Sequence, residues 1–336
     1  MKNLLYIGNN LSAENKTPTT VETLGRLLTL EGFNVKVASS KPNKLMRLLD
    51  MFAAVYKSRK NVDYVLIDTY STVNFYYAFL VSQLCRILRL KYIPILHGGK
   101  LPERLSSSVK LSQLIFNNAY KNVAPSLYTK SRFEGFGYTN VICIPNSIEL
   151  KDYSFKARVF DTVNLLWVRS FSRLYNPLLA IDILKFLKDE GIDSRLCMIG
   201  PDNDGSLEEA KNHARKLSLE VEFTGILTKK QWHKKAKDFN IFINTTNIDN
   251  TPVSVIEAMA LGLPVVSTNV GGLPFLIRNG VDGVLVEPND INTFTEAIKY
   301  LIGNSENILR ITEAARLKVE EFDWEVVKGK WISLLS

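Results

Sequence analysis

The chain alternates short apolar runs with longer segments in which apolar residues recur every three to four positions. The short runs have the length and β-branched composition of buried strands, and the longer segments have the period of amphipathic helices. The expected strands lie at residues 4–7, 34–39, 64–68, 92–96, 122–126 and 141–146 in a first series, and at 164–168, 195–200, 221–225, 241–245, 264–268 and 283–287 in a second. This alternation predicts an α/β fold in which parallel strands are covered by helices on both faces.

The two strand series predict two domains. The chain has 336 residues, 46% of them hydrophobic, which is enough for two medium-sized cores, so each series is expected to form one Rossmann-like half. A polar stretch at 151–161 separates the series, and 322–336 carries Trp324 and Trp331 on an amphipathic helical pattern. We therefore expect domains at 1–155 and 156–321, followed by a C-terminal helix at 322–336.

The segment from Asp249 to Pro264 places two carboxylates eight positions apart across a predicted helix start. Thr251 is expected to cap this helix and Pro252 to occupy its first position, so that Asp249 precedes the helix and Glu257 lies inside it. If all eight steps were helical, the acids would stand roughly 12 Å apart, too far to share one reacting bond. They either hold hydroxyls on two parts of one elongated ligand, or serve as an additional cap and a solvated helix residue.

Further candidate binding positions lie at element ends. The N–H groups of Val253 and Ser254 belong to the first helical turn, where the macrodipole favours an anion such as phosphate. Gly8 and Asn9 follow the first expected strand and His97 ends the fourth, and parallel sheets bind ligands at these strand ends. A histidine in this position is also commonly a structural, hydrogen-bonded residue, so both interpretations of His97 stay open.

Several motifs resemble those of the retaining, GT-B-fold glycosyltransferases of family 4. Asp249 and Glu257 stand at the two acidic positions of the family's E-x7-E region, and 264–274 resembles the strand and Gly-Gly turn that follow. The segment 165–177 resembles the strand and loop that carry the family's diphosphate-binding Arg, which Arg169 matches. The likeness extends over nearly the whole chain.

Three positions depart from the family pattern. The family's Lys is missing near Leu174 and Tyr175, where Arg173 lies one turn earlier and could reach the same phosphate. Asp249 is one methylene shorter than the usual Glu, and Phe275 replaces another usual Glu. These departures concern the second cation at the diphosphate and the contacts with the donor sugar.

The resemblance implies two Rossmann-like domains facing a cleft, a C-terminal helix that packs back on the first domain, and a donor bound between the domains. It implies that Glu257 binds the ribose hydroxyls and that Asp249, His97 and Arg169 form the catalytic set. The remaining donor contacts that it implies are Arg169, Arg173 and the amides of Val253 and Ser254 at the diphosphate, Gly225 and Ile226 at the base, and Gly8 and Asn9 in the first loop.

The implied activity is retaining transfer of a sugar from a UDP- or GDP-sugar to a glycan or lipid-linked acceptor, as in bacterial surface polysaccharide synthesis. In the family mechanism the departing phosphate takes the acceptor proton, so neither a metal nor another cofactor is expected. The three histidines form no metal-ligand spacing with one another or with cysteine. Two alternatives stay open: a GT-B hydrolase or epimerase acting on UDP-sugars, and a non-catalytic partner subunit of the same fold.

Charge is distributed unevenly along the chain. Residues 1–149 carry 19 Lys and Arg against 9 Asp and Glu, a net +10, whereas the remainder carries 23 against 25, a net −2. The basic cluster at 41–60 flanks a predicted helix with an apolar stripe. It is either a solvated basic face or a platform for an anionic membrane surface or lipid-pyrophosphate acceptor. No nucleic-acid-binding motif accompanies the charge.

The sequence also predicts a cytoplasmic protein, with the inner face of the membrane as the place of any membrane contact. No apolar run reaches the roughly 18 residues that a spanning helix needs. The N-terminal residues read as a first strand instead of a secretory signal. The three cysteines are widely spaced, which indicates reduced thiols.

Overall fold

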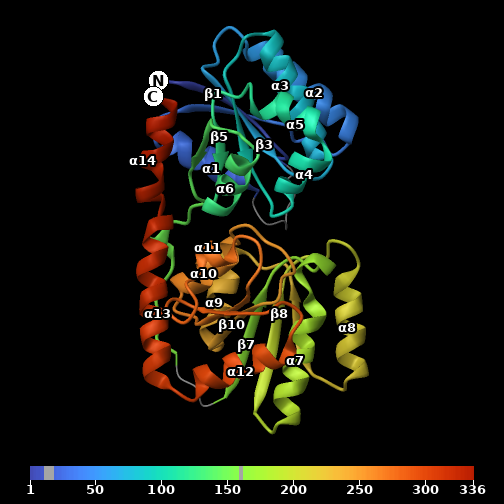
Figure 1. Ribbon diagram of the computed structural model, residues 1–336, viewed down its shortest axis with the longest axis vertical. Coiled ribbons are helices and arrows are strands. Elements are labelled where there is room, and N and C mark those ends of the chain that lie inside the picture. The colour runs from blue at the N-terminus through green and yellow to red at the C-terminus, as the bar shows by residue number, and fades with distance from the viewer. Residues whose placement is uncertain (11–18, 159–161) are drawn as a thin grey trace. The chain divides into compact units, whose positions relative to one another are not determined.

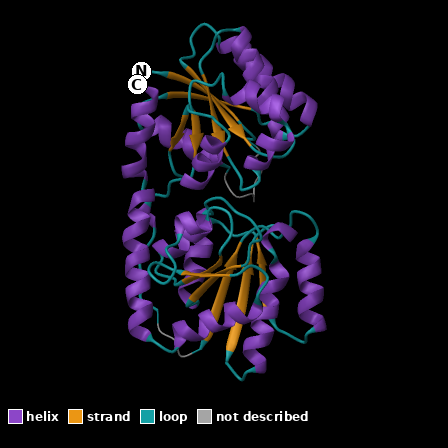
Figure 2. Ribbon diagram, in the orientation of Figure 1, coloured by secondary structure: helices purple, strands orange, loops and turns teal. Residues whose placement is uncertain are grey.

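The computed structural model describes residues 1–10, 19–158 and 162–336, which form two compact units. Unit 1 comprises Met1–Asn146 and Val327–Ser336, and unit 2 comprises Ser147–Val326. Each unit is built on one six-stranded sheet with helices packed against it (Figure 1, Figure 2). All strand pairs within both sheets are parallel, so the predicted α/β class is confirmed.

Unit 1 has the strand order β2-β1-β3-β4-β5-β6. Its strands are β1 Asn3–Ile7, β2 Asn34–Ala38, β3 Tyr64–Thr69, β4 Tyr92–Leu96, β5 Asn122–Ala124 and β6 Val141–Cys143. Its helices are α1 Thr20–Leu30, α2 Lys44–Ser58, α3 Asn74–Ile87, α4 Leu101–Ser107, α5 Val109–Phe116 and α6 Leu127–Gly135. Helices α2 and α3 bury Met51, Val55 and Val81 against the sheet, because both helices carry apolar residues at helical spacing.

Unit 2 has the strand order β12-β11-β10-β7-β8-β9. Its strands are β7 Val163–Val168, β8 Ser194–Ile199, β9 Val221–Gly225, β10 Ile241–Asn244, β11 Val265–Thr268 and β12 Val284–Val286. Its helices are α7 Pro177–Asp189, α8 Ser206–Lys216, α9 Lys229–Lys235, α10 Val253–Ala260, α11 Leu273–Leu276, α12 Ile291–Ile302 and α13 Ser305–Val319, with short 3-10 turns at Leu150–Asp152, Arg173–Tyr175, Ala236–Asp238 and Glu320–Phe322. Neighbouring residues of β7 enter opposite cores, Trp167 on one face and Leu166 on the other, as the alternation of a strand requires.

The strand order in each sheet reverses beside the unit's first strand. In unit 1, β1 lies between β2 and β3, and in unit 2, β7 lies between β8 and β10. Chain segments leaving such neighbouring strands diverge to opposite faces and leave a crevice at the carboxyl ends. The residues that follow β7 and β10, and those that follow β1 and β3, are therefore placed to bind ligands.

The division between the units lies at Asn146, not at residue 155 as the sequence indicated. Ile148, Leu150 and Tyr153 pack into a core of unit 2. Arg158 donates hydrogen bonds to the carbonyls of three unit 2 residues, Ala236, Phe239 and Leu261. The described part of the expected linker is thus attached to unit 2, and residues 159–161 lie outside the described residues.

The first residues of the C-terminal helix α14, Trp324–Leu335, belong to unit 2, and the remaining residues belong to unit 1. The Trp324 N–H donates to the Ile148 carbonyl at 2.8 Å in unit 2. From Val327 onward the chain is part of unit 1, where Lys328 forms an ion pair with Glu31 at 3.6 Å.

Helix α2 exposes apolar side chains in addition to basic ones. The residues Leu45, Met46, Leu49 and Tyr56 are each more than half exposed. Arg47 is buried and donates to the Lys41 and Pro42 carbonyls and to Asn9. The outer face of α2 therefore carries apolar side chains in addition to solvated basic ones. Among the described residues, no helix combines the length and apolarity that crossing a bilayer requires.

Candidate functional site

Helix α10 begins one residue later than predicted. Its first residue is Val253, and Pro252 is the N-cap in an extended conformation with φ −68° and ψ 120°. The Pro252 carbonyl accepts from the N–H groups of Val255 at 3.1 Å and Ile256 at 3.3 Å. Thr251 therefore lies outside the helix and is not its cap, because the extended backbone at Pro252 starts the first turn there.

The start of α10 presents hydrogen-bond donors. Val253 and Ser254 occupy the first two helical positions, whose N–H groups have no helical carbonyl to bond. The Ser254 hydroxyl oxygen is buried and has no hydrogen-bond partner within the described chain. A buried hydroxyl without a partner is destabilising by about 1–3 kcal/mol, so this position favours a ligand that accepts hydrogen bonds.

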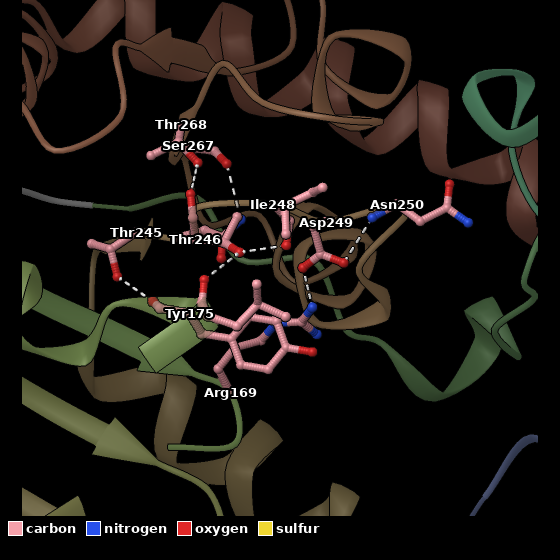
Figure 3. Close-up of polar contacts among 11 residues, drawn as sticks. Arg169, Tyr175, Thr245, Thr246, Ile248, Asp249, Asn250, Ser267 and Thr268 are labelled. Atoms are coloured by element: carbon pink, nitrogen blue, oxygen red, sulfur yellow. Dashed lines mark hydrogen bonds and ion pairs between the residues drawn. The ribbon is translucent and has the colours of Figure 1, made fainter. Parts of the chain in front are cut away.

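Arg169 and Asp249 form an ion pair at the crevice of unit 2 (Figure 3). Arg169 directly follows β7, and its N–H donates to the Ile199 carbonyl at 3.0 Å, which fixes the residue at the strand end. The Asp249 Oδ2 atom accepts from the guanidinium, and Oδ1 accepts from the Asn250 N–H at 2.9 Å. Both side chains are largely buried, with exposed fractions of 18% and 10%.

The Arg169 guanidinium lies over the Tyr175 ring, 4.2 Å from its centre (Figure 3). Burial alone would lower the pKa of this guanidinium, but the Asp249 charge and hydrogen bond, together with Tyr175, outweigh burial and raise the pKa. The Arg169 Nε atom is buried and has no acceptor among residues 1–10, 19–158 and 162–336. The site thus holds a permanent positive charge with one N–H still unused.

A network of hydroxyl groups fixes the segment 245–250 that carries Asp249 (Figure 3). The Thr268 hydroxyl donates to the Thr246 carbonyl at 2.7 Å, and the Thr246 hydroxyl donates to the Ile248 carbonyl at 2.9 Å. The Thr245 hydroxyl donates to the Tyr175 carbonyl at 3.0 Å, which links the loops that follow β10 and β7.

The Gly-Gly turn after β11 supports the same segment. A Cβ atom on Gly271 would lie 2.1 Å from the Asp249 carbonyl oxygen, and one on Gly272 would lie 2.0 Å from that of Asn250. Gly271 also has φ +55°, a conformation that favours glycine. The two glycines are therefore required by the close approach of the Asp249 backbone.

Glu257 is buried on α10 within a polar cluster that the sequence analysis did not identify. Its Oε1 atom accepts from the Tyr153 hydroxyl at 2.6 Å and from Lys229 Nζ at 2.9 Å. The His233 ring lies against the Tyr153 ring with centres 4.4 Å apart. Burial, followed by the Glu257 charge, raises the pKa of Tyr153, which therefore remains a hydrogen-bond donor. The second carboxylate oxygen, Oε2, is left for a further donor.

Arg173 is directed away from Arg169. It forms an ion pair with Glu209 on α8 at 2.5 Å, and its side chain is 76% exposed. The contact of Arg173 with the diphosphate stays a prediction.

Gly225 and Ile226 lie at the end of β9, as expected for a position that contacts a base. Gly225 has φ +70°, and its carbonyl accepts from the Gly200 N–H at 2.9 Å. Ile226 is 40% exposed. The contact of this pair with a base stays a prediction.

The backbone groups of Gly8, in the first loop of unit 1, are bonded to Ala38 and Ser39. The Gly8 N–H donates to the Ala38 carbonyl at 2.7 Å, and the Gly8 carbonyl accepts from Ser39 at 2.9 Å. The Asn9 side chain accepts from Arg47 at 3.1 Å. The contact of Gly8 and Asn9 with a diphosphate stays a prediction.

His97 lies beside a buried carboxylate that the sequence analysis missed. Its Nε2 atom is 2.9 Å from Asp68 Oδ1 at the end of β3, and Tyr6 donates its hydroxyl to the same oxygen at 2.8 Å. The Tyr70 ring stacks on the imidazole with centres 4.7 Å apart. The structural and the ligand-binding interpretations of His97 are both compatible with these contacts.

Little in the sequence could have indicated these partners. Tyr153 stands in a polar stretch that resembles a linker, and Lys229 is one of several lysines on a short helix. Asp68 ends an expected strand and was a usable signal, since such positions line the crevice. No group of three or more potential metal ligands occurs among the described residues. The expectation of a metal-independent reaction stays a prediction.

The sequence is similar to that of known proteins, and the family match lies almost entirely in unit 2. Residues 155–318 match the family model described as Glycosyl transferases group 1. The sulfoquinovosyl transferase SQD2 of Arabidopsis thaliana is 28% identical over 156 residues, which are 45% of this chain but only 29% of that protein. The amylovoran biosynthesis glycosyltransferase AmsK of Erwinia amylovora is 25% identical over 327 residues, 92% of this chain and 78% of that protein.

A solved structure supports the architecture of both units. The structure of Anabaena HepE in complex with UDP-glucose matches with a TM-score of 0.80 at 18% identity, covering 100% of this chain and 99% of that chain. The match includes both Rossmann-like units, each with its six-stranded parallel sheet. The chain therefore has the GT-B fold, and its residues 155–318 are similar to the glycosyl transferases group 1.

Proposed function

We propose that this protein is a retaining glycosyltransferase that moves a sugar from a nucleoside diphosphate sugar to a glycan or lipid-linked acceptor. The observation that carries the proposal is the buried Arg169–Asp249 pair at the crevice of unit 2, next to the start of α10. This arrangement combines a fixed cation, a helix N-terminus and a carboxylate, which are complementary to a diphosphate followed by sugar hydroxyls.

The diphosphate is the leaving group, and its contacts are the most specific part of the proposal. The Nε–H of Arg169 and the hydroxyl of Ser254 lack partners within the described residues. In this proposal, phosphate oxygens accept from both groups and from the amides of Val253 and Ser254. Such prearranged donors stabilise the charge that develops as the sugar bond breaks, typically by about 3–4 kcal/mol for one well-placed donor.

The two carboxylates hold the two ends of the donor. Glu257 presents Oε2 to the ribose hydroxyls, because Tyr153 and Lys229 both occupy Oε1. Asp249 binds donor-sugar hydroxyls with the lone pairs that remain after it has accepted from Arg169 and Asn250. The departing phosphate takes the acceptor proton, so the sugar is transferred on the same face without a protein nucleophile or a metal.

The donor is proposed to be a UDP-sugar. The support is the similarity to HepE, whose structure holds UDP-glucose. Isothermal titration calorimetry with UDP and GDP, followed by turnover of a panel of sugar nucleotides, tests this proposal. Absence of binding for every nucleoside diphosphate overturns it, and stronger binding of GDP corrects the base. Sugar-nucleotide consumption that is independent of any acceptor identifies a hydrolase or epimerase instead.

The acceptor is proposed to be a growing surface polysaccharide or its lipid-linked precursor. AmsK is named for amylovoran biosynthesis and is similar over 92% of this chain. Helix α2 supports contact with an anionic membrane, because its outer face exposes Leu45, Met46, Leu49 and Tyr56 and such faces insert at the headgroup boundary. The flanking cations are Lys41, Lys44, Lys57, Arg59 and Lys60.

Vesicle sedimentation tests the membrane contact. The protein is expected to bind phosphatidylglycerol vesicles and not phosphatidylcholine vesicles. Leu45→Asp together with Leu49→Asp is expected to abolish binding, whereas Leu309→Asp, an exposed leucine on α13, is expected to leave it unchanged. Equal binding of all three proteins contradicts a role for α2.

A second candidate function is a non-catalytic GT-B partner subunit. Two contacts favour it. Tyr175 stacks under Arg169 near the place of the family's second cation, and Arg173 is paired with Glu209. Binding of UDP without turnover of any UDP-sugar, in the presence of acceptor extracts, distinguishes this function from the transferase.

A further inference from the structure

Unit 2 has a second concave region at the end of its sheet opposite the Arg169–Asp249 crevice. Arg169 follows the carboxyl end of β7, whereas Ser194 and Val221, which line this region, are the first residues of β8 and β9. Because these strands are parallel, the two regions lie at opposite ends of the sheet. The region, which we call the basal hollow, has a volume of about 720 Å³, within the size range of small-molecule sites.

The basal hollow is lined by more positive than negative charge. Its cations are Lys188, Arg195, Lys211 and Arg215, and its carboxylates are Glu220 and Glu222. Glu222 is already paired with Lys235 at 2.6 Å. Lys211 and Arg215 share one carboxylate, Glu208, at 4.0 and 3.5 Å. With Lys235 and Glu208 included, five cations face three carboxylates, so a net charge of +2 is left at the hollow.

The helix ends beside the hollow do not take up these cations. Lys188 and Arg215 lie in the last turns of α7 and α8, which lie side by side (Figure 1), and the macrodipole favours cations there. The carbonyls of both residues, however, already accept hydrogen bonds from their own turns, from Gly191 and Ser218 at 3.0 Å each. The cationic head groups are therefore open to a ligand.

Two polar groups of the hollow have no partner within the described chain. Ser194 is 4% exposed, and its hydroxyl makes no hydrogen bond to residues 1–10, 19–158 or 162–336. The carboxylate of Glu220 forms neither an ion pair nor a hydrogen bond with those residues. A buried hydroxyl without a partner is destabilising, and a carboxylate accepts from hydroxyl groups. Both groups therefore favour a ligand that carries hydroxyls.

The remaining wall of the hollow is apolar. Leu196 of β8 and Val221 and Phe223 of β9 line it, and small-molecule sites usually combine such a surface with a few polar groups that fix orientation. A simple anion would be repelled by Glu220 and would leave the apolar wall unused. An uncharged sugar would leave the cations unused. A sugar ring with a negative charge uses all three kinds of group.

We propose that the basal hollow is a second ligand site, which binds a sugar that carries a carboxylate or phosphate group. The negative charge lies against Lys188, Lys211 and Arg215. The sugar hydroxyls bind Ser194 and Glu220, and a C–H face of the ring packs on Phe223. Such a ligand is either one residue of an acidic polysaccharide or a free sugar phosphate. The proposal does not depend on sugar transfer, because the site lies away from the proposed donor contacts.

Calorimetry at pH 7 with four probes tests the binding and distinguishes the two sources. Tetragalacturonate represents the acidic polysaccharide and glucose 6-phosphate the free sugar phosphate, and binding of either supports the proposal and identifies its source. Maltotetraose and inorganic phosphate are expected to bind at least about tenfold more weakly, since each lacks one part of the ligand. Equal binding of inorganic phosphate, or no binding of either acidic sugar, overturns the proposal.

A matched pair of lysines on α7 locates the bound sugar. Lys188→Gln is expected to weaken binding of the acidic sugar about tenfold, because it removes a charge that lines the hollow. Lys185→Gln is the control, since Lys185 pairs with Asp189 on the same helix and does not line the hollow. Equal affinities for Lys188→Gln and wild type contradict the site. Binding that UDP abolishes places the sugar in the donor crevice and also contradicts it.

Two buried serines separate binding from stability. Ser194→Ala is expected to weaken binding of the acidic sugar about fivefold and to leave the urea midpoint of the free protein unchanged or higher, because the hydroxyl has no partner to lose. Ser206→Ala, which removes a hydroxyl bonded to Asp204, is expected to lower the midpoint without affecting binding. A midpoint lowered equally in both variants, or unchanged affinity in Ser194→Ala, overturns the role of Ser194. Absence of sugar transfer overturns the proposed function and leaves these binding results valid.

Discussion

The crevices of the two units have the same layout but different chemistry. In unit 2, the buried carboxylate of Asp249 is paired with Arg169, and in unit 1 the buried carboxylate of Asp68 is paired with His97. Both carboxylates lie at the carboxyl ends of strands beside a reversal of strand order. The guanidinium is permanently charged, whereas an imidazole can gain or lose its charge near neutral pH.

The Arg169–Asp249 crevice of unit 2 suits a charged ligand. A permanent cation beside a helix N-terminus favours a diphosphate, which carries charge at all relevant pH values. The crevice of unit 2 is thus suited to an anion.

Arg169→Ala is expected to have the largest effect on activity. Loss of the guanidinium removes the principal charge at the leaving group, and transfer is expected to fall about 1,000-fold, against about 10- to 100-fold for His97→Ala. Steady-state kinetics with the preferred donor measure both. Arg215→Ala, an exposed arginine paired with Glu208 on α8, serves as the control and is expected to match the wild type. Equal losses for Arg169→Ala and His97→Ala contradict the contrast between the units.

Glu257→Ala and Asp249→Ala are expected to separate nucleotide binding from sugar transfer. Glu257→Ala removes the proposed ribose contact and leaves Lys229 beside Tyr153 without its carboxylate, so UDP binding is expected to weaken about 10- to 100-fold. Asp249→Ala is expected to lower transfer more than UDP affinity. Calorimetry with UDP and turnover of the UDP-sugar are compared for both variants, and equal UDP affinity in both variants and wild type contradicts this division of roles.

Glycine substitutions test how closely the backbone supports each carboxylate. Gly271→Ala forces a Cβ atom against the Asp249 carbonyl at a positive φ, and the free energy of unfolding is expected to fall by about 3 kcal/mol or more. Gly280→Ala is the control, because it has φ +73° and open space around its Cβ position, and is expected to lose about 1 kcal/mol. Gly8→Ala meets a side-chain oxygen of Asp68 instead of backbone and is expected to fall between the two. Urea unfolding measures all three, and equal losses for Gly271→Ala and Gly280→Ala exclude the backbone contact as the cause.

The smallest expected effect concerns His233 beside Glu257. Burial lowers the pKa of His233 below 6.5, opposed by the Glu257 and Asp152 charges and assisted by Lys229. The unfolded chain therefore binds this proton more readily, so the contribution to stability is present above about pH 6.5 and is lost as the pH falls through that value. His233→Gln is expected to flatten the decline in the free energy of unfolding between pH 7.5 and 5.5. Identical slopes for variant and wild type in urea titrations exclude this contribution.

The sequence predicted the strands of both sheets but not several of the residues at which elements begin or end. All twelve expected strands occur in the two sheets, because a buried parallel strand needs a short apolar run that local composition reveals. The start of α10 was placed one residue early, because Thr251 and Pro252 match the usual pattern of N-cap and first helical residue, whereas the extended backbone of Pro252 makes it the N-cap. The exposed apolar face of α2 was missed because its helical spacing is the same as that of a buried face.

What the sequence by itself determined about this protein is its class, its twelve strands, the resemblance carried by Arg169, Asp249 and Glu257, and the basic character of the first half. Only the tertiary structure decided the partners of those groups: Arg169 with Asp249, Tyr153 with Glu257, and Asp68 with His97. The physical reason is distance along the chain. Strand and helix patterns arise from neighbouring residues, whereas these contacts join residues 80, 104 and 29 positions apart, and only the packing of the sheets brings them together.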